Sequence, residues 1–405
     1  MLRKYDPKEW GGTETHVVEV TRRLALRGFE PIVHAPKGPT ARDEALASNV
    51  PLVRYRAFLP FVGTPKARRA LVANAGNIAS FEEPLRLVCD PKVQLCHLHT
   101  SGRIGGAVRT AMRATGRPYI VSVHGPMLAN QAWLTDDHKK RSRGTLDVGA
   151  PIGALFGSRR VLDDAARVIT FNEEERIALS QRIGDRAVRM DHGVDRVRLS
   201  SGSVERAQSR ASWAAFAHAK VVVLIGRMAA QKNQVFAVRA FAAGAPPDHH
   251  LVLAGAFTDP GYRDVVEKEA ELLGIRSRVH ILGNLRAQDE VPDLLKLATL
   301  VIVPSTHEAF GLAVLEAWAA EKPVLFARHS GLADLADAVG HEASSIRELD
   351  VEVWAAALKR MLADEGLRRA IAQAGHLLVS SRYDWDRVVD RLIALYREVL
   401  VEGIR

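Results

Sequence analysis

The chain has 405 residues, a hydrophobic content of 47% and a formal net charge of +9 at pH 7. This length exceeds one ordinary hydrophobic core and predicts two domains of about 200 residues each. Cys89 and Cys96 have no partner cluster, which excludes a disulfide framework and a cysteine zinc site. No run approaches roughly 18 apolar residues and no signal peptide opens the chain, so we expect a cytoplasmic protein.

The positive charge lies in the first half. Residues 1–195 hold 30 Lys+Arg against 21 Asp+Glu, whereas the remaining residues hold 26 of each. Nucleic acid is one candidate partner, but no aromatic-rich basic stretch or groove-reading motif accompanies the charge. An anionic acceptor or an anionic membrane surface fits better, and the clusters at 66–69 and 138–143 would contact it. Solvated surface charge is the alternative for each cluster.

The amino terminus carries a glycine turn. Gly11 and Gly12 remove side chains where a backbone must approach a ligand closely, and Thr13 begins a helical pattern. Only residues 1–10 precede this turn, so residues 2–5 supply at most the tail of a strand. Either the sheet starts with a stub or the true start lies upstream.

Short β-branched runs alternate with helical segments in both halves, which predicts doubly wound units with parallel sheets. The expected strands of the first half are 30–35, 50–55, 93–99, 118–124 and 166–171. Those of the second half are 220–226, 250–255, 278–283, 300–304 and 323–327. The polar stretch 195–212 is predicted to be the linker. The last helical segment has a structural apolar face, formed by Trp385, Val388, Val389, Leu392, Tyr396 and Val399.

Three histidines lie on expected strands of the first half. His97 and His99 alternate and so point to the same face, but no carboxylate stands at ligand spacing. We therefore expect a core or crevice-lining role and no metal. His124 closes the strand 118–124 before Gly125, where a histidine is more often structural.

Two cations follow the strand 220–226. Arg227 comes directly after it and Lys232 opens the next helix. In an open parallel sheet, ligands bind outside the carboxyl ends of the strands. A planar guanidinium and a mobile ammonium at that edge suit a diphosphate, although ordinary surface charge is the alternative.

Two glutamates follow the strand 300–304. Gly311 permits a tight turn into a helix, so the N–H groups of Phe310, Gly311 and Leu312 and the helix dipole favour a phosphate. Glu308 precedes the turn, and Glu316 lies about one turn into the helix. Carboxylates so near a phosphate would repel it and are better suited to accept hydrogen bonds from sugar or ribose hydroxyls. The alternative is a loop charge and a solvated helix residue.

These motifs, in this order, resemble the retaining nucleotide-sugar glycosyltransferases of family four, which have the GT-B fold. The resemblance covers nearly the whole chain. It is carried by GGTETHVVEVTRRLALRGFEPIVHAP (11–36), IVSVHG (120–125), DHGVD (191–195), LIGRMAAQK (224–232), LGN (282–284), HEAFGLAVLEAWAAEKPV (307–324) and DWDRVVDRLIALYREVL (384–400).

The resemblance implies an α/β fold of two doubly wound, Rossmann-like domains that face each other across a cleft. We expect an acceptor-side domain at 1–195, a donor-binding domain at 196–380, and a C-terminal helix at 381–405 that returns to the first domain. Glu321 stands where the family usually has Gly, Ser330-Gly331 replaces Gly-Gly, and Asp334 replaces Glu. These departures affect loop geometry and not the donor contacts.

The resemblance also implies a site. Its expected catalytic residues are Glu308, His124, Arg227 and Lys232; its donor contacts are Gly11, Gly12, Gly283, Asn284, Leu285, Phe310, Gly311, Leu312 and Glu316; and its acceptor side includes Thr13 and His99. The expected reaction needs neither metal nor cofactor. It moves a sugar from a UDP-, GDP- or ADP-sugar to a carbohydrate, lipid-linked or small-molecule acceptor, with attack and departure on the same face. We expect it in the cytoplasm or on the inner face of the membrane.

Three other classes of protein are alternatives to a glycosyltransferase. A nucleotide-sugar epimerase shares the GT-B fold but lacks this Arg/Lys and glutamate pattern. A nicotinamide dehydrogenase would need a G-x-G-x-x-G after a first strand, and the chain has none. A non-catalytic anion-binding or nucleic-acid-binding protein would explain the basic charge but not the donor residues.

Overall fold

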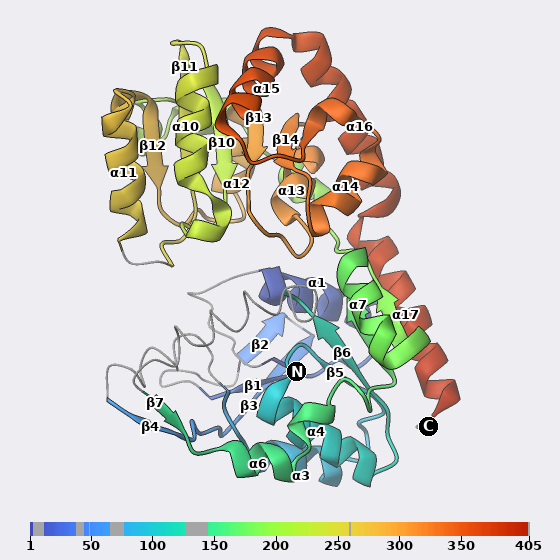
Figure 1. Cartoon of the computed structure of the whole chain (residues 1–405). Coiled ribbons are helices and arrows are strands. Elements are labelled where there is room, and N and C mark those ends of the chain that lie inside the picture. The colour runs from blue at the N-terminus through green and yellow to red at the C-terminus, as the bar shows by residue number, and fades with distance from the viewer. Residues whose placement is uncertain are drawn as a thin grey trace. The chain divides into compact units, whose positions relative to one another are not determined.

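The computed structural model describes residues 1–2, 12–37, 44–47, 49–64, 77–125, 145–258 and 261–403. The chain divides into two compact units (Figure 1). Unit 1 comprises Met1–Asp191 and Asp386–Arg405, and unit 2 comprises His192–Trp385. No helix in the described part of the chain is both long and apolar enough to cross a membrane.

Unit 1 combines parallel and antiparallel strand pairs: its four-stranded sheet is parallel throughout, whereas β2 pairs with β3 and β4 with β7 in antiparallel fashion. Its four-stranded sheet has the order β5-β6-β8-β9 and its three-stranded sheet the order β1-β3-β2, while β4 pairs with β7. The strands are β1 (Val33–Pro36), β2 (Glu44–Ala47), β3 (Val50–Tyr55), β4 (Phe61–Gly63), β5 (Cys96–Leu98), β6 (Tyr119–Val123), β7 (Thr145–Asp147), β8 (Arg167–Thr170) and β9 (Ala187–Arg189). The helices are α1 (Gly12–Leu26), α3 (Glu82–Cys89), α4 (Gly102–Ala114), α6 (Ala150–Leu155), α7 (Glu173–Ile183), the 3-10 turns η1 (Ser158–Arg160) and η2 (Gly184–Arg186), and α17 (Trp385–Glu402).

The first two residues join these sheets. The Met1 amino group donates to the carbonyl of His97 at 2.6 Å, and the N–H of His99 donates to the carbonyl of Met1 at 2.9 Å. On the other side, the N–H of Leu2 donates to the carbonyl of His34 at 2.9 Å. Met1 and Leu2 thus lie between β1 and β5, where the sequence predicts a strand stub. Residues 3–5 of that stub lie outside the described residues.

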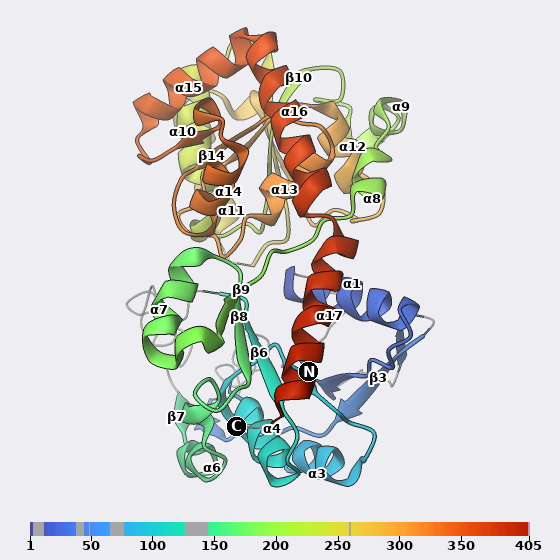
Figure 2. The same cartoon turned by 90° about the vertical axis from the view of Figure 1, so that its right-hand side faces the viewer.

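Helix α17 packs in unit 1 beside α1 (Figure 2). All six residues of its predicted apolar face are buried, and all of them except Trp385 belong to unit 1. Its polar side pairs with the unit, because Arg27 bonds Asp390 at 3.0 Å and Arg391 bonds Asp191 at 2.8 Å. Burial of the stripe, with ion pairs at its border, explains why this amphipathic helix is part of unit 1.

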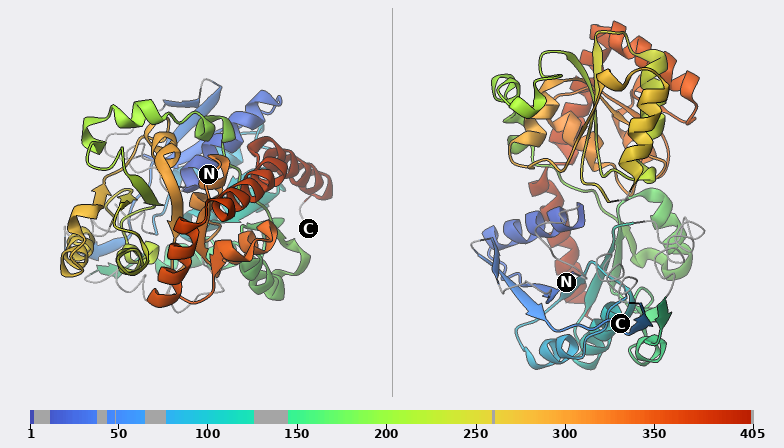
Figure 3. Two further views of the ribbon diagram at one scale, coloured as in Figure 1. Left: turned by 90° about the horizontal axis from the view of Figure 1, so that it is seen from above. Right: turned by 90° about the vertical axis from the view of Figure 1, so that its left-hand side faces the viewer.

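Unit 2 is a six-stranded parallel sheet with the order β12-β11-β10-β13-β14-β15. Its strands are β10 (Lys220–Ile225), β11 (His249–Ala254), β12 (Val279–Leu282), β13 (Ala298–Val303), β14 (Val324–Ala327) and β15 (Ser345–Ile346). Helices lie on both sides of the sheet (Figure 3, right). They are α8 (Arg196–Ser200), α9 (Val204–Gln208), α10 (Gln234–Gly244), α11 (Tyr262–Leu272), α12 (Glu290–Leu297), α13 (Leu312–Ala319), α14 (Gly331–Val339), α15 (Val351–Ala363) and α16 (Glu365–Arg382), with 3-10 turns η3 (Ala211–Trp213), η4 (Ala230–Lys232), η5 (Arg276–Arg278) and η6 (Glu342–Ser344).

The chain order reverses between β10 and β13. From β10 the chain runs outward through β11 to β12, then returns to place β13 on the other side of β10. These central strands are almost entirely buried, which is why their sequences are continuous apolar runs. Such a switch point leaves a crevice at the carboxyl ends of the two strands, where ligands bind in open α/β sheets.

All ten strands expected from the sequence are present, with ends displaced by a few residues. The additional strands β2, β4, β7, β9 and β15 are two to four residues long. The prediction of a linker at 195–212 is wrong. This stretch forms α8, α9 and most of η3 within unit 2, where Arg206 and Arg210 pair with Asp293 of α12.

Candidate functional site

The predicted cation Lys232 meets the predicted acid Glu308 at the switch point. The Lys232 ammonium forms an ion pair with Oε1 of Glu308, and the Ser305 hydroxyl donates to the same oxygen at 2.9 Å. Glu308 is only 9% exposed. A carboxylate so deeply buried needs compensation for its lost hydration, which the ammonium and the hydroxyl supply.

Hydrogen bonds between the loops after β10 and β13 hold these two side chains in place. The N–H of Thr306 donates to the carbonyl of Gln231 at 2.9 Å, and the Gln231 amide donates to the carbonyl of His307 at 2.8 Å. The Asn233 amide donates to the carbonyl of Pro304 at 3.2 Å. Hydrogen bonds to backbone carbonyls of this kind fix loop positions that side-chain ion pairs alone would not fix.

Arg227 lies at the same edge, directly after β10. Its carbonyl accepts from the amide of the buried Gln234 at 2.9 Å, which fixes its backbone. Its side chain is exposed and makes no hydrogen bond or ion pair with a described residue. The edge of β10 thus presents one cation paired with Glu308 and another directed to solvent.

Gly311 makes the turn into α13 that the sequence predicts. Its φ is +90°, and a Cβ there would lie 2.5 Å from a Leu332 methyl carbon, so any other residue would be strained and would displace Leu332. The N–H of Gly331 donates to the carbonyl of Glu308 at 2.9 Å and supports the turn from behind. As at any helix start, the N–H groups of Gly311 and Leu312 have no acceptor within α13, so this end suits an anion.

Glu316 lies one turn into α13 and keeps 28% of its side chain exposed. Burial raises the pKa of its carboxyl, and the guanidinium of Arg198, 3.7 Å away, opposes that rise. The other donor-side residues, Gly283, Asn284 and Leu285, follow β12 in an irregular segment. There the carbonyl of Gly283 accepts from the N–H of Gly255 at 3.1 Å.

Two of the departures from the family pattern have a positive φ. Glu321 has φ +59° and Ser330 has φ +49°, both in the left-handed region that favours glycine. Ser330 gains a hydrogen bond from this position, because its hydroxyl lies 3.0 Å from Nδ1 of His307. Both non-glycine residues therefore carry backbone strain.

The candidate residues of unit 1 belong to a cluster of histidines. Nδ1 of His99 lies 2.8 Å from Nε2 of His124, and the His124 ring stacks on Phe171 with centroids 4.7 Å apart. The ring of His97 stacks on that of His99 at 4.4 Å, and His16 of α1 lies within 5.6 Å of His99. His97 also bonds the hydroxyls of Tyr396 at 2.6 Å and Ser122 at 2.8 Å.

Burial favours the uncharged forms of His97 and His99. It lowers the pKa values of His97 and His99 well below their usual range, and the neighbouring histidines and the Met1 amino group lower them further. The described residues include no group of three or more His, Cys, Asp or Glu arranged to hold a metal ion. Gly12 and Thr13 begin α1, whereas Gly11 lies outside the described residues.

A basic pocket opens where β1 and β3 end. Its charged lining residues are Lys37, Arg54, Arg56, Glu82 and Arg86, and the rings of Phe58 and Phe81 stack beside them with centroids 5.6 Å apart. Lys37 and Arg56 are exposed, whereas Arg86 pairs with Glu82. The clusters 66–69 and 138–143, expected to contact an anionic partner, lie outside the described residues.

Sequence reasoning missed several residues that contact the predicted site. Gln231 lies within the motif 224–232 and Ser305 just before the motif 307–324, and only the pairing of the two loops reveals their contacts. Arg198 was assigned to the linker. The helix signal here is Asp195, whose side chain caps α8 by accepting from the N–H of Arg198 three residues later. Because α8 has only five residues, this signal is easy to miss.

Comparison with known proteins identifies the family. The profile of Glycosyltransferase Family 4 matches residues 10–198, and that of Glycosyl transferases group 1 matches residues 205–377. D-inositol 3-phosphate glycosyltransferase 1 of Catenulispora acidiphila is 30% identical over 97% of this chain and 92% of its own length. A relative from Salinispora tropica with the name D-inositol 3-phosphate glycosyltransferase is 28% identical over 97% of this chain and 82% of its own.

Solved structures agree on the fold. The Anabaena protein HepE, crystallised with UDP-glucose, has a TM-score of 0.73 at 18% identity over 98% of both chains. Sucrose-phosphate synthase from Thermosynechococcus elongatus has a TM-score of 0.74 at 18% identity over 97% of this chain and 94% of its own. The parallel sheets of the two units agree with the family profiles and with these neighbours. The chain therefore belongs to the family-four glycosyltransferases of the GT-B fold.

Proposed function

We propose that this glycosyltransferase moves a sugar from a nucleoside-diphosphate sugar to a hydroxyl of its acceptor and retains the anomeric configuration. One observation carries the donor assignment. Arg227, Lys232 and Glu308 gather at the adjoining ends of β10 and β13, and the start of α13 follows directly. Cations and helix N–H groups suit the diphosphate, and carboxylates suit hydroxyls.

Each residue has a separate task in this proposal. Arg227, Lys232 and the N–H groups of Phe310, Gly311 and Leu312 stabilise the charge that builds on the departing phosphate, which is usually the largest electrostatic contribution to catalysis. Glu308 holds sugar hydroxyls and favours the positive charge that develops on the sugar. Its other oxygen, Oε2, makes no hydrogen bond with a described residue.

The remaining assignments follow the family resemblance. His124 contacts the transferred sugar, Glu316 accepts from the ribose, and the backbone at Gly283, Asn284 and Leu285 contacts the base. Gly11 and Gly12 also contact the donor, whereas Thr13 and His99 lie on the acceptor side. The leaving phosphate takes the proton of the acceptor hydroxyl, so the new bond forms on the face from which the old one leaves. No metal or cofactor takes part. The anomeric configuration of the product, read by NMR, and activity in excess chelator test these two points.

An anionic acceptor fits the first half of the chain. The relatives from Catenulispora and Salinispora are named for D-inositol 3-phosphate, and HepE was crystallised with UDP-glucose. The basic pocket at the ends of β1 and β3 places Lys37 and Arg56 at the carboxyl edge of a sheet, where a phosphate group would be attracted. A phosphorylated polyol is therefore the first acceptor to try, ahead of neutral sugars and lipid-linked acceptors. The expected location of the enzyme is the cytoplasm or the inner face of the membrane.

A two-step experiment tests the proposal. UDP-, GDP- and ADP-sugars are first screened by thermal shift, because a ligand of the folded state raises apparent stability. The best donor is then incubated with inositol 3-phosphate, with unphosphorylated inositol, and without acceptor. We expect transfer to the phosphorylated acceptor only. Binding of none of the donors would overturn the donor assignment. Conversion of the donor in the absence of any acceptor would favour the alternative, a nucleotide-sugar epimerase.

A further inference from the structure

Arg198 contacts Glu316 and a turn two residues beyond the segment that the proposed function assigns to the base. One guanidinium nitrogen, Nη1, donates to the carbonyl of Ala287 in the segment after β12. The other, Nη2, lies 3.7 Å from Oε1 of Glu316 in α13. The side chain is only 17% exposed. A single arginine thus links the turn that follows the expected base-contacting segment to the carboxylate expected to hold the ribose.

The backbone around Arg198 is firmly held. Its N–H donates to Oδ1 of the capping residue Asp195 at 3.0 Å, and its neighbour Leu199 is 1% exposed. Its carbonyl accepts from the Ser201 hydroxyl at 2.7 Å. A long side chain loses less conformational entropy on making a contact when its backbone is already fixed.

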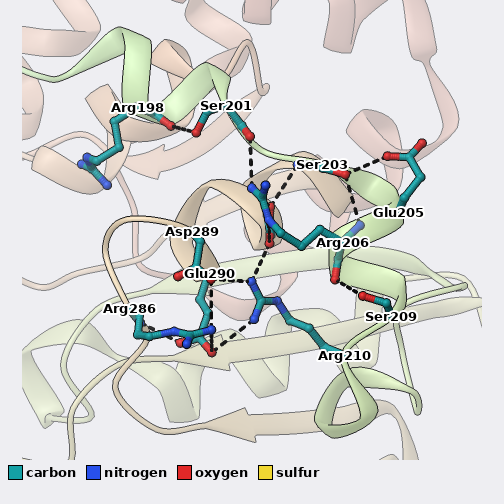
Figure 4. A network of polar contacts seen from close by, with 11 residues as sticks. Arg198, Ser201, Ser203, Glu205, Arg206, Ser209, Arg210, Arg286, Asp289 and Glu290 are labelled. Carbon is teal, nitrogen blue, oxygen red and sulfur yellow. Dashed lines mark hydrogen bonds and ion pairs between the residues drawn. The ribbon is translucent and has the colours of Figure 1, made fainter.

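An ion network extends this support to α12 (Figure 4). The carbonyl of Ser201 accepts from Arg206 at 3.1 Å, and Arg206 forms an ion pair with the fully buried Asp293 at 2.6 Å. Arg210 pairs with the same carboxylate at 2.7 Å and with Asp289 at 2.9 Å. The chain after α8 is therefore attached to α12, which helps to fix the backbone from which the Arg198 side chain extends.

The chemistry of Glu316 gives this contact a purpose. A carboxylate lying largely among protein atoms favours its neutral form, which accepts hydrogen bonds less strongly than the anion. A guanidinium beside it favours the anion and restricts its orientation. Ribose hydroxyls are hydrogen-bond donors, so an oriented anion binds them more tightly than a free or protonated carboxyl does.

We propose that Arg198 is a positioning residue for the nucleoside: it fixes the Glu316 carboxylate so that its remaining acceptor positions take the ribose hydroxyls of the donor. The inference rests on the proposed function. A purely structural role makes a different prediction. Loss of a structural arginine would weaken the binding of every nucleotide equally, whereas loss of Arg198 should weaken only the binding that the ribose hydroxyls contribute.

The experiment compares UDP with 2′-deoxy-UDP by calorimetry, or the diphosphate pair of another base if the thermal-shift screen selects it. The parent protein should prefer the ribonucleotide by about tenfold or more, the equivalent of one charge-assisted hydrogen bond. Arg198→Met should lose most of that preference by weakening UDP, with the affinity for 2′-deoxy-UDP within about twofold of the parent. Arg198→Lys, which keeps the charge, should restore part of the preference.

Arg239→Met is the matched control, because Arg239 also pairs with a glutamate of unit 2, Glu269, at 2.7 Å. It should leave both affinities unchanged. Equal weakening of the two nucleotides by Arg198→Met, or an unchanged preference, overturns the inference and leaves the donor assignment intact. If the parent binds no nucleoside diphosphate, the donor assignment fails and the inference fails with it. If Arg198→Met does not fold, the ribose preference of Arg198→Lys decides, and full parent preference with full affinity sinks the proposal.

Discussion

The Lys232 ammonium and the Glu308 carboxylate form an ion pair across two loops that are 76 residues apart in sequence. Glu308 is nearly buried, so its charge depends on Lys232 and on the Ser305 hydroxyl. Removing either partner of such a pair leaves the other poorly compensated. Effects of substitutions at the two positions should therefore not add, and each is best compared with a control elsewhere on the sheet.

The first prediction concerns the phosphate-binding cations. Arg227→Ala and Lys232→Ala should each weaken nucleoside diphosphate binding by about 1.5–3 kcal/mol, more than roughly tenfold, because each removes a charge-assisted contact. Calorimetric titration with the diphosphate measures this. Lys220→Ala is the control, since Lys220 begins the same strand and pairs with Asp248 at its other end. Unchanged affinity in Lys232→Ala would remove that residue from the donor site.

The second prediction separates the two glutamates. Glu308→Gln should lower kcat by about a hundredfold or more, because the lost charge would act on the reacting sugar, while the diphosphate still binds. Glu316→Ala should weaken the diphosphate itself by about tenfold through the lost ribose contact. Steady-state kinetics and calorimetry on both variants separate the two effects. If both variants lose only nucleotide affinity, the assignment of Glu308 to the transferred sugar is wrong.

Much of the fold could be predicted from the sequence. The central strands have continuous apolar sequences because helices cover both faces of the sheet, and these runs are readable without an alignment. The short strands β2, β4, β7, β9 and β15 were not predictable, because two to four residues carry too little pattern. The helices at 196–208 were missed because their polar surface resembles a linker, although their charges pair with α12.

The site could be predicted only as a set of residues and not as an arrangement. The motifs around Lys232 and Glu308 were both identified, but their contact depends on β13 returning to the side of β10, a sheet order that periodicity does not reveal. The contact of Arg198 with Glu316 was invisible for the same reason. Contacts between distant segments come from topology, whereas sequence patterns report mainly local structure.

The third prediction concerns backbone strain at Glu321. A non-glycine residue in the left-handed region costs roughly 1–2 kcal/mol, partly offset by the extra entropy that glycine adds to the unfolded chain. Glu321, with φ +59°, should therefore be replaceable by glycine with a gain of about 0.5–1 kcal/mol. The melting temperature of Glu321→Gly should rise. Ala320→Gly, one residue earlier with φ −84°, should lower it. A fall in both variants would mean that the Glu321 side chain outweighs its backbone strain.

The last prediction follows from the histidine cluster of unit 1. Burial lowers the pKa values of His97 and His99, and the charged forms of His16, His124 and the Met1 amino group would oppose their protonation further. The folded chain then binds fewer protons than the unfolded chain between these lowered pKa values and the ordinary value of about 6.5. The resulting stability is complete above about pH 6.5 and is lost as the pH falls below it.

Urea denaturation at about pH 7.5, 6.5 and 5.5 should therefore show that the free energy of unfolding decreases as the pH is lowered. The decrease should be up to about 1.4 kcal/mol per pH unit for each buried histidine. Other histidines with lowered pKa values, such as His280, add to this slope, so a variant must isolate the cluster. His97→Gln should be less stable at neutral pH, through its lost ring contacts, but should show a shallower slope. His218→Gln, at an exposed position, should keep the parent slope. An equal slope in His97→Gln and the parent would show that His97 becomes protonated without opposing the fold, and that its burial does not control the acid sensitivity of unit 1.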